Sequence, residues 1–191
     1  MSPSPDQAVA IGASAGGVQA LLTLLPTLPA DFPWPIFIVL HVPADRGNVL
    51  APLFEAKCRL EVKEAEDKET ARPGVIYFAP SDYHLLVESN GDLALSSDEA
   101  VNYSRPSIDV LFESAADAYG AGLTGVILTG ANEDGAAGLS AVAAAGGIAL
   151  VEEPAAAYAQ AMPQAARNAC DAALALPLQR IAEHLKGLGK A

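Results

Sequence analysis

Three residues of different chemistry each follow a short apolar run of this sequence. Ser14 lies in AIGASAGGVQALL, His41 ends PIFIVLH, and Asp134 lies in LTGANEDGAAGL. A serine hydroxyl, an imidazole and a carboxylate are the groups of a nucleophilic triad, in which the histidine accepts the serine proton and the carboxylate orients the ring. The residue types therefore predict acyl transfer or ester hydrolysis if the fold brings the three groups together.

The glycines around Ser14 suit a tight turn from a strand into a helix. We expect Gly12 to permit a sharp exit from the strand, and the glycines at 16–17 to permit close approach of substrate and neighbouring backbone. Ser14 would then lie at the start of a helix, where free backbone N–H groups favour an anion. The N–H of Ala15 is one expected oxyanion donor, and the loop containing Ala131 would supply the second.

Each of these residues also has a structural interpretation. A strand, a glycine-rich turn and a helix also describe a phosphate-binding loop, although the lysine of a P-loop and a full G-x-G-x-x-G pattern are both missing. His41 could simply end an apolar strand, and Asp134 could cap a helix, with Glu133 as a competing carboxylate. The order Ser, His, Asp also differs from the Ser, Asp, His order of the α/β-hydrolases.

Strands and helices must position these residues, and the apolar pattern predicts both. Short apolar runs typical of buried parallel strands lie at 8–12, 35–41, 74–80, 125–130 and 147–152. Helical patterns lie at 18–25, 49–56, 108–119, 136–145, 164–169 and 178–186. This alternation predicts an α/β fold of three layers, Rossmann-like and doubly wound, with a mainly parallel sheet. The carboxyl ends of such strands share one rim, where α/β proteins place their sites.

Two segments interrupt the alternation. Residues 83–97 are expected to form an antiparallel hairpin at an edge, because Asn90-Gly91 is typical of a turn with two positive φ angles. The acidic run 61–69 predicts a solvated loop or an edge strand. No linker divides the chain, so we expect a single domain over residues 1–191 with its core at about 8–186.

The composition excludes several classes of function. A formal net charge of -12, with only 11 Lys and Arg, argues against a nucleic-acid partner. The two cysteines have neither metal-ligand spacing nor the dense pattern of a secreted disulfide scaffold, which fits a reducing cytoplasm. Neither a signal peptide nor a membrane-spanning stretch is visible, which predicts a cytoplasmic protein without membrane insertion. Among other polar residues, we expect a structural hydrogen bond at His84. We expect Arg105 either to contact a carboxylate or a partner surface, or to pack beside Pro106 where a helix starts.

Five ordered blocks together resemble a known family. IGASAGGVQAL, the strand-terminal His41, YSRPSIDVLFESAA, GVILTGANEDGAAGL and EEPAAAYAQAMPQAA are similar to the catalytic domain of the chemotaxis protein-glutamate methylesterases, the CheB type. The resemblance implies a serine esterase that removes methyl groups from glutamate esters on cytoplasmic helices of chemoreceptors and releases methanol, with deamidation of some glutamines. It implies no metal or organic cofactor, and it assigns the catalytic roles to Ser14, His41 and Asp134.

The sequence departs from the family pattern near the site. Ala15 stands where the family often has serine or threonine, and Leu40 where it often has glutamine. Ala131 and Asn132 replace a methionine and a glycine. No receiver domain of the kind that usually precedes the family's catalytic domain is visible before the first expected strand, so we expect either a free-standing member or a piece of a longer chain. The altered residues Leu40, Ala131 and Asn132 keep open the alternative of a docking or signalling module whose esterase site has decayed.

Overall fold

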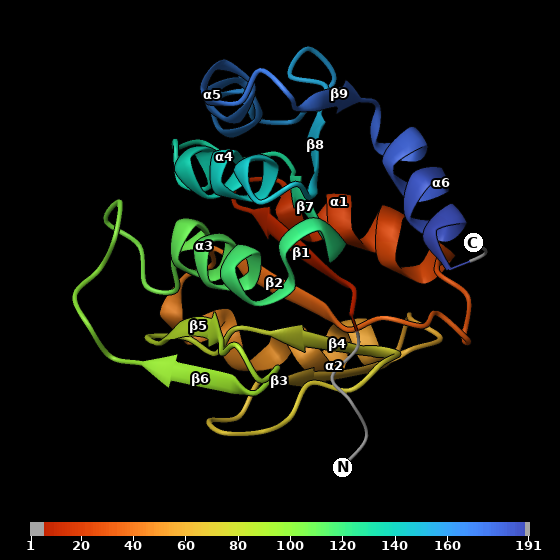
Figure 1. Cartoon of the computed structure of the whole chain (residues 1–191), viewed down its shortest axis with the longest axis vertical. Coiled ribbons are helices and arrows are strands. Elements are labelled where there is room, and N and C mark those ends of the chain that lie inside the picture. The colour runs from red at the N-terminus through yellow and green to blue at the C-terminus, as the bar shows by residue number, and fades with distance from the viewer. Residues whose placement is uncertain (1–5, 190–191) are drawn as a thin grey trace.

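The structure, a computed structural model, describes residues 6–189 and is built around a seven-stranded sheet (Figure 1). Its strands are β1 (Ala8–Ala13), β2 (Ile36–Leu40), β3 (Glu61–Glu64), β4 (Val75–Phe78), β7 (Leu123–Ile127), β8 (Ile148–Glu152) and β9 (Leu174–Leu176). All neighbours pair in parallel, in the order β3-β4-β2-β1-β7-β8-β9. The predicted α/β class and mainly parallel sheet are confirmed. Strands β2, β3 and β4 lie on one side of β1, and strands β7, β8 and β9 lie on the other side. The direction in which the chain adds strands therefore reverses at β1, and such a switch point is the usual place for a site.

Helices cover both faces of this sheet. They are α1 (Gly17–Leu24), α2 (Leu50–Glu55), α3 (Ile108–Tyr119), α4 (Ala136–Ala144), α5 (Ala161–Ala169) and α6 (Leu178–Leu188), with 3-10 turns at Leu25–Thr27, Ala44–Val49 and Gly120–Gly122. Alternate residues of β1 point to opposite faces: Ala8 and Ala10 belong to one buried cluster, Val9 and Ile11 to the other. The two clusters give the three layers that the sequence predicted.

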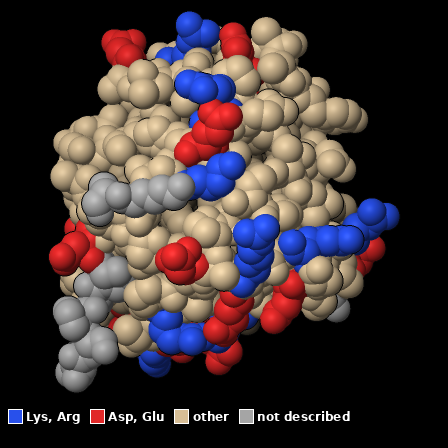
Figure 2. All heavy atoms as spheres, turned by 90° about the vertical axis from the view of Figure 1, so that its right-hand side faces the viewer, with Lys and Arg blue, Asp and Glu red and all other residues tan. Residues whose placement is uncertain are grey.

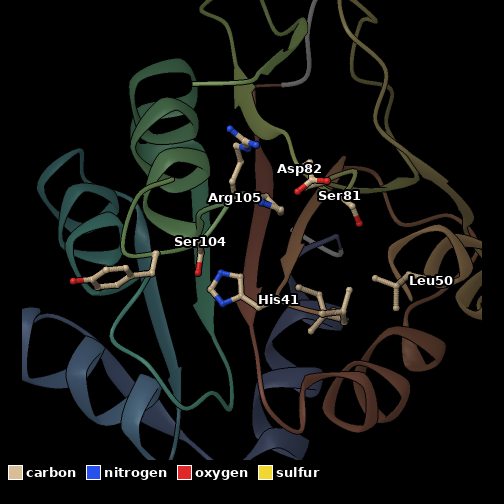
Figure 3. A pocket seen from close by; sticks show the side chains of 11 residues that line it. His41, Leu50, Ser81, Asp82, Ser104 and Arg105 are labelled. Atoms are coloured by element: carbon tan, nitrogen blue, oxygen red, sulfur yellow. The ribbon is translucent and has the colours of Figure 1, made fainter. Parts of the chain in front are cut away.

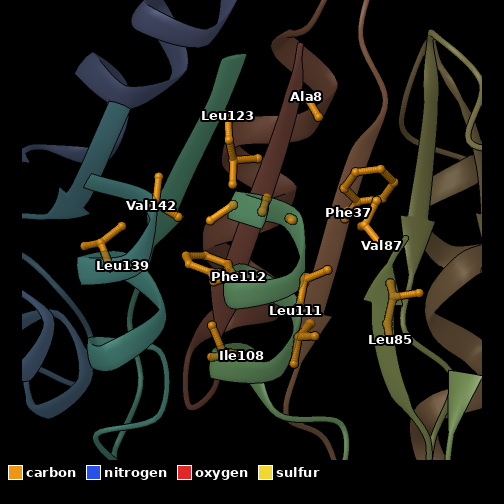
Figure 4. Close-up of a cluster of buried hydrophobic side chains, with 14 of the residues drawn as sticks. Ala8, Phe37, Leu85, Val87, Ile108, Leu111, Phe112, Leu123, Leu139 and Val142 are labelled. Carbon is orange, nitrogen blue, oxygen red and sulfur yellow. The ribbon is translucent and has the colours of Figure 1, made fainter. Parts of the chain in front are cut away.

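The cluster under α3 brings that helix very close to the central strand (Figure 4). Ile108, Leu111 and Phe112 of α3 are fully buried in it. A Cβ at Gly12 would collide with the Ile108 side chain. Gly12 lies within β1, so the expectation of a sharp strand exit at Gly12 is wrong: the glycine is needed because α3 approaches β1 closely.

The hairpin is confirmed, with two corrections. Strands β5 (His84–Val87) and β6 (Leu93–Ser96) pair antiparallel, but they form a separate two-stranded sheet that packs its buried residues against the α3 cluster. Gly91 has a φ of 84°, whereas Asn90 is not among the residues with positive φ. The Gly91 N–H donates to Glu88 O at 2.8 Å. The turn is thus a type I turn followed by a left-handed glycine, which Asn-Gly also permits.

Several boundaries differ from the predictions. The acidic run forms edge strand β3 and then a loop. Lys63 of β3 holds this loop, since its Nζ lies 2.9 Å from Glu66 Oε1 and 2.8 Å from Glu69 Oε2. Strand β9 was not predicted, because it has only three residues and is partly exposed at the sheet edge. Helix α5 begins three residues before the predicted start, since Pro163 in its first turn lacks an N–H that would have no partner there.

One face of the molecule carries charged side chains of both signs. On the face shown in Figure 2, Lys and Arg side chains lie between Asp and Glu side chains and do not gather into one basic patch. Among the helices of residues 6–189, none is long and apolar enough to cross a bilayer.

Candidate active site

His41 and Asp134 meet at the carboxyl rim of the sheet. His41 follows β2 and Asp134 lies in the loop between β7 and α4, on opposite sides of β1 in the strand order. His41 Nε2 lies 2.9 Å from Asp134 Oδ2, with side-chain exposures of 13% and 0%. The contact is close but is not aligned as a regular hydrogen bond. Nδ1 is consequently the ring nitrogen left for proton transfer.

The Asp134 carboxylate is held by the start of α3. Its Oδ1 accepts hydrogen bonds from Ser107 Oγ at 2.8 Å, Asn102 Nδ2 at 2.8 Å and Asp109 N at 3.2 Å. Its Oδ2 accepts from Ile108 N at 2.7 Å. Ser107, at the N-cap position, makes no side-chain cap of its own. Asp134 therefore caps α3 from outside the helix, where a negative charge is favoured.

These donors decide the ionisation of Asp134. Burial by itself would raise the pKa of this carboxyl, but the contacts with His41 and with the Ile108 amide outweigh burial, so that the pKa lies below its usual value. An acceptor-only carboxylate surrounded by donors is stable in its charged form. Asp134 can thus hold the imidazole ring and stabilise a positive charge on it.

Ser14 lies next to His41 at the end of β1. The backbone register pairs Ala13 with Leu40, so Ser14 and His41 are the residues that follow this pair on adjacent strands. The His41 N–H donates to Ala13 O at 3.0 Å. Ser14 is half-buried, and within residues 6–189 its hydroxyl forms no hydrogen bond. The hydroxyl is therefore available to Nδ1 or to a substrate.

The backbone around Ser14 leaves amide donors free. Gly16, with a φ of 79°, precedes α1 in a left-handed conformation, and a Cβ there would collide with Tyr158. Neither the Ala15 N–H nor the Ala131 N–H donates to any group in the described part of the chain. Ala15 lies at the start of α1 and Ala131 in the loop before α4, and unpaired backbone amides of this kind are suitable donors to an oxyanion. Their assignment as the oxyanion hole stays a prediction.

Thr129, at the end of the LTG segment, connects the two loops that carry these amides. Its carbonyl accepts from Ser14 N at 2.9 Å, and its hydroxyl donates to Ala15 O at 2.8 Å. The Ala159 N–H donates to the same hydroxyl at 2.8 Å. Thr129 N donates in turn to the buried carboxyl of Glu152 at 2.8 Å. The turn at Ser14 is therefore positioned from β7 and β8 as well as from its own strand.

Glu152 provides a test of this support. Burial raises the pKa of Glu152, only partly offset by the Thr129 amide. A carboxyl with a raised folded-state pKa loses native stability as the pH rises from its unfolded value, about 4.3, through its folded value. Glu152→Gln keeps an acceptor for Thr129 and never ionises. We measure the melting temperature of Glu152→Gln minus that of the wild type by thermal unfolding at pH 4 and at pH 7. We expect this difference to be more positive at pH 7 than at pH 4.

The matched control is Glu153→Gln, an exposed neighbour on the same segment. It should show the same difference from the wild type at both pH values. The other buried carboxyls are common to all three proteins and cancel in the comparison. A Glu152→Gln difference that is constant with pH, or larger at pH 4, would contradict the role of the buried charge.

Asn132 connects the loop before α4 with the His41 ring. The Asp134 N–H donates to Asn132 Oδ1 at 3.0 Å, and Asn132 Nδ2 lies 3.4 Å from His41 Nδ1. This residue is one of the departures from the family pattern noted above. Its side chain reaches the ring nitrogen that Asp134 leaves free.

A pocket of about 240 Å³ opens beside His41 (Figure 3). Ser81, Asp82, Ser104 and Arg105 are among its lining residues, but Ser14 is not. Arg105 Nη1 donates to the carbonyls of residues 97 and 98 at 3.0 and 3.1 Å, and its buried Nε has no partner among the described residues. Arg105 thus brings a positive charge to the wall of the pocket.

His84 has a structural role, as expected. Its Nδ1 accepts from Ser107 N at 3.1 Å, so its Nε2 is the donor to Glu99 O at 2.9 Å. The imidazole thereby joins the hairpin to the segment that precedes α3. Within residues 6–189, no group of three or more His, Cys, Asp or Glu side chains is arranged to hold a metal ion.

Sequence reasoning missed the residues that hold the proposed triad in place. Thr129 lies between an apolar run and a glycine, where a turn residue is unremarkable, and Asn102 lies in an irregular loop. Only Ser107 carried a signal, since a serine directly before a helical pattern is a typical cap. Even that signal would have directed its hydroxyl to its own helix and not to Asp134.

Comparison with known proteins gives a consistent result. The family model described as CheB methylesterase matches residues 9–185. The solved structure of the Thermotoga maritima CheB methylesterase catalytic domain superposes with a TM-score of 0.88 at 35% sequence identity, covering 95% of this chain and 98% of that chain.

Curated relatives carry matching names. A putative protein-glutamate methylesterase/protein-glutamine glutaminase of Leptospira interrogans is 47% identical over 177 residues, covering 93% of this chain and 92% of the relative. Protein-glutamate methylesterase/protein-glutamine glutaminase 5 of Myxococcus xanthus is 40% identical over 174 residues, covering 90% of this chain and 50% of the relative. The chain thus spans nearly all of the first relative and half of the second.

Proposed function

The chain belongs to the CheB methylesterase family, and we propose that it is a serine esterase that hydrolyses glutamate γ-methyl esters on chemoreceptors and releases methanol. The names of the relatives pair this activity with that of a glutaminase, so deamidation of glutamine is part of the proposal. The observation that carries it is the 2.9 Å contact between His41 and Asp134 beside the turn that presents Ser14.

In the proposed reaction, Ser14 Oγ attacks the ester carbonyl carbon while His41 Nδ1 accepts the hydroxyl proton. The tetrahedral intermediate carries its negative charge on the former carbonyl oxygen, toward which the Ala15 and Ala131 amides would donate. The carbon–oxygen bond then breaks, and His41 returns the proton to the departing oxygen, giving methanol and an acyl-enzyme. Water, activated by the same Nδ1, hydrolyses the acyl-enzyme and releases the glutamate carboxylate and Ser14.

Asp134 acts throughout on the ring and not on the substrate. Its lowered pKa keeps it ionised, so it stabilises the imidazolium formed when Ser14 loses its proton. Each oxyanion donor lowers the barrier by roughly 3 kcal/mol. The proposal needs no metal or organic cofactor for these steps.

The partner in this proposal is the methylated cytoplasmic helix of a chemoreceptor, which makes the protein cytoplasmic and places it in chemotaxis or a related sensory pathway. Residues 1–191 would act as one methylesterase-type catalytic domain. Tyr158 lies against Gly16 and Tyr103 lines the pocket beside His41, and both are exposed, at 84% and 104%, so each is available to contact such a helix.

Methanol release from methylated receptors of the same cell tests the proposal. We expect the purified protein to release methanol and to react with a serine-directed fluorophosphonate probe at Ser14. Peptide mapping of the labelled protein identifies the residue. A protein that binds the receptor but neither releases methanol nor labels at Ser14 would instead be the decayed docking module.

A further inference from the structure

We propose that Asn132 makes the site selective for esters over carboxamides, by directing an amide donor at the leaving group. The inference rests on the proposed function and adds a determinant of which substrate that function prefers. Its basis is the position of the Asn132 side chain between Asp134 and the free nitrogen of His41.

The orientation of the Asn132 amide follows from its neighbour. The Asp134 N–H requires an acceptor and lies 3.0 Å from Asn132 Oδ1. The end of the amide that faces the Asp134 N–H must therefore be its oxygen, Oδ1. The other end, Nδ2, is then the donor that faces His41. This side-chain bond to the backbone two residues on also fixes the loop conformation.

Asn132 Nδ2 lies where the leaving group must pass. Since His41 Nε2 faces Asp134, Nδ1 must hand its proton to the departing atom at hydrogen-bond distance. Asn132 Nδ2 is 3.4 Å from His41 Nδ1, and a contact of this length holds the Asn132 amide only weakly. An atom that accepts the proton from Nδ1 is therefore also within reach of Nδ2.

Esters and carboxamides differ in what they offer to this donor. The departing ester oxygen has two lone pairs, so one takes the proton from His41 while the other accepts a hydrogen bond from Nδ2. The carbon–oxygen bond breaks and methanol leaves. The departing nitrogen of a carboxamide has one lone pair in the tetrahedral intermediate, and the His41 proton occupies it as ammonia leaves. The two N–H groups of the departing nitrogen then face the N–H groups of Asn132, so donors face donors and none of them has an acceptor.

Asn132 thus stabilises the transition state of ester cleavage and not that of amide cleavage. Discrimination of this kind is effective because a polar group without a partner in a half-buried site is unfavourable. It adds to the intrinsic difference in reactivity between the two substrates and is a property of this chain's own loop.

Asn132→Ser is the first test. A serine oxygen can still accept from the Asp134 N–H, but the shorter side chain has no donor that reaches His41. The substrate is one receptor fragment prepared with a single site either as the γ-methyl ester or as glutamine, with methanol and ammonia measured. We expect the ratio of the two kcat/KM values, ester to amide, to fall about tenfold, the effect of one hydrogen bond.

Asn132→Asp is the second test, because it keeps both the turn and the side-chain shape but puts an acceptor where Nδ2 lies. The ratio should fall further, since the acceptor now suits the N–H groups of the carboxamide. Effects on His41 itself are shared by both substrates and cancel in the ratio. Glu133→Gln, an exposed change in the same loop, should leave the ratio unchanged.

The outcomes separate the two proposals. A wild-type protein without methanol release would refute the proposed function. If the wild type is active but Asn132→Ser and Asn132→Asp keep the wild-type ratio, or lose both activities equally, Asn132 only supports the Asp134 loop and the inference is overturned.

Discussion

Ser14→Ala is expected to lower methanol release at least about 10⁴-fold, because the variant retains the base and the oxyanion donors but has no nucleophile. The same change should leave stability within about 0.5 kcal/mol of the wild type, since the hydroxyl forms no hydrogen bond within residues 6–189. Methanol release, fluorophosphonate labelling and chemical denaturation, measured on one preparation, check both expectations.

Ser140→Ala is a matched control. Ser140 is also half-buried at a helix, but its hydroxyl donates to Ala136 O and Ala169 O, in α4 and at the end of α5. Its loss should lower stability slightly and leave methanol release intact. Full activity or labelling in Ser14→Ala would mean that another residue is the nucleophile, and the mechanism proposed for this rim would then be wrong.

The large-scale placement of the site could be predicted because it depends on strand ends. Apolar runs identify buried strands, parallel strands need crossovers, and crossovers bring the strand ends to one rim. That reasoning put His41 and Asp134 on the same rim although 93 positions separate them in the chain. The structure brings these two side chains into contact, while the position of Ser14 beside His41 follows from the strand register.

The contacts that support the site could not be predicted in the same way. Thr129, Asn102 and Asn132 lie in irregular segments, whose hydrogen bonds depend on the course of the backbone and not on any periodicity. The departure at Asn132 was visible in the sequence, but the direction of its amide depends on the Asp134 N–H. Likewise, Gly12 was identified as a special position, yet the reason is Ile108 of a distant helix.

Asp134→Asn is expected to damage both activity and stability, unlike the change at Ser14. Five groups surround the carboxylate, namely His41 Nε2, Asn102 Nδ2, Ser107 Oγ and the amides of Ile108 and Asp109. An asparagine amide would turn its nitrogen toward several of these donors, leaving them unpaired at the start of α3. We expect a loss of about 10⁴-fold in kcat and about 3 kcal/mol in unfolding free energy.

The pH dependence of this stability loss distinguishes a buried charge from a shape effect. Because the folded-state pKa of Asp134 is lowered, its contribution to stability is fully present above the unfolded value of about 3.9 and is lost as the pH falls through the folded value. The stability difference between wild type and Asp134→Asn should therefore be full at pH 6 and shrink below about pH 4. Asp117→Asn, an exposed change on α3, the helix that Asp134 caps, should show no such stability difference from the wild type at any pH. If Asp134→Asn lost activity but kept wild-type stability at pH 6, Asp134 would orient His41 without capping α3, contrary to the contacts described above.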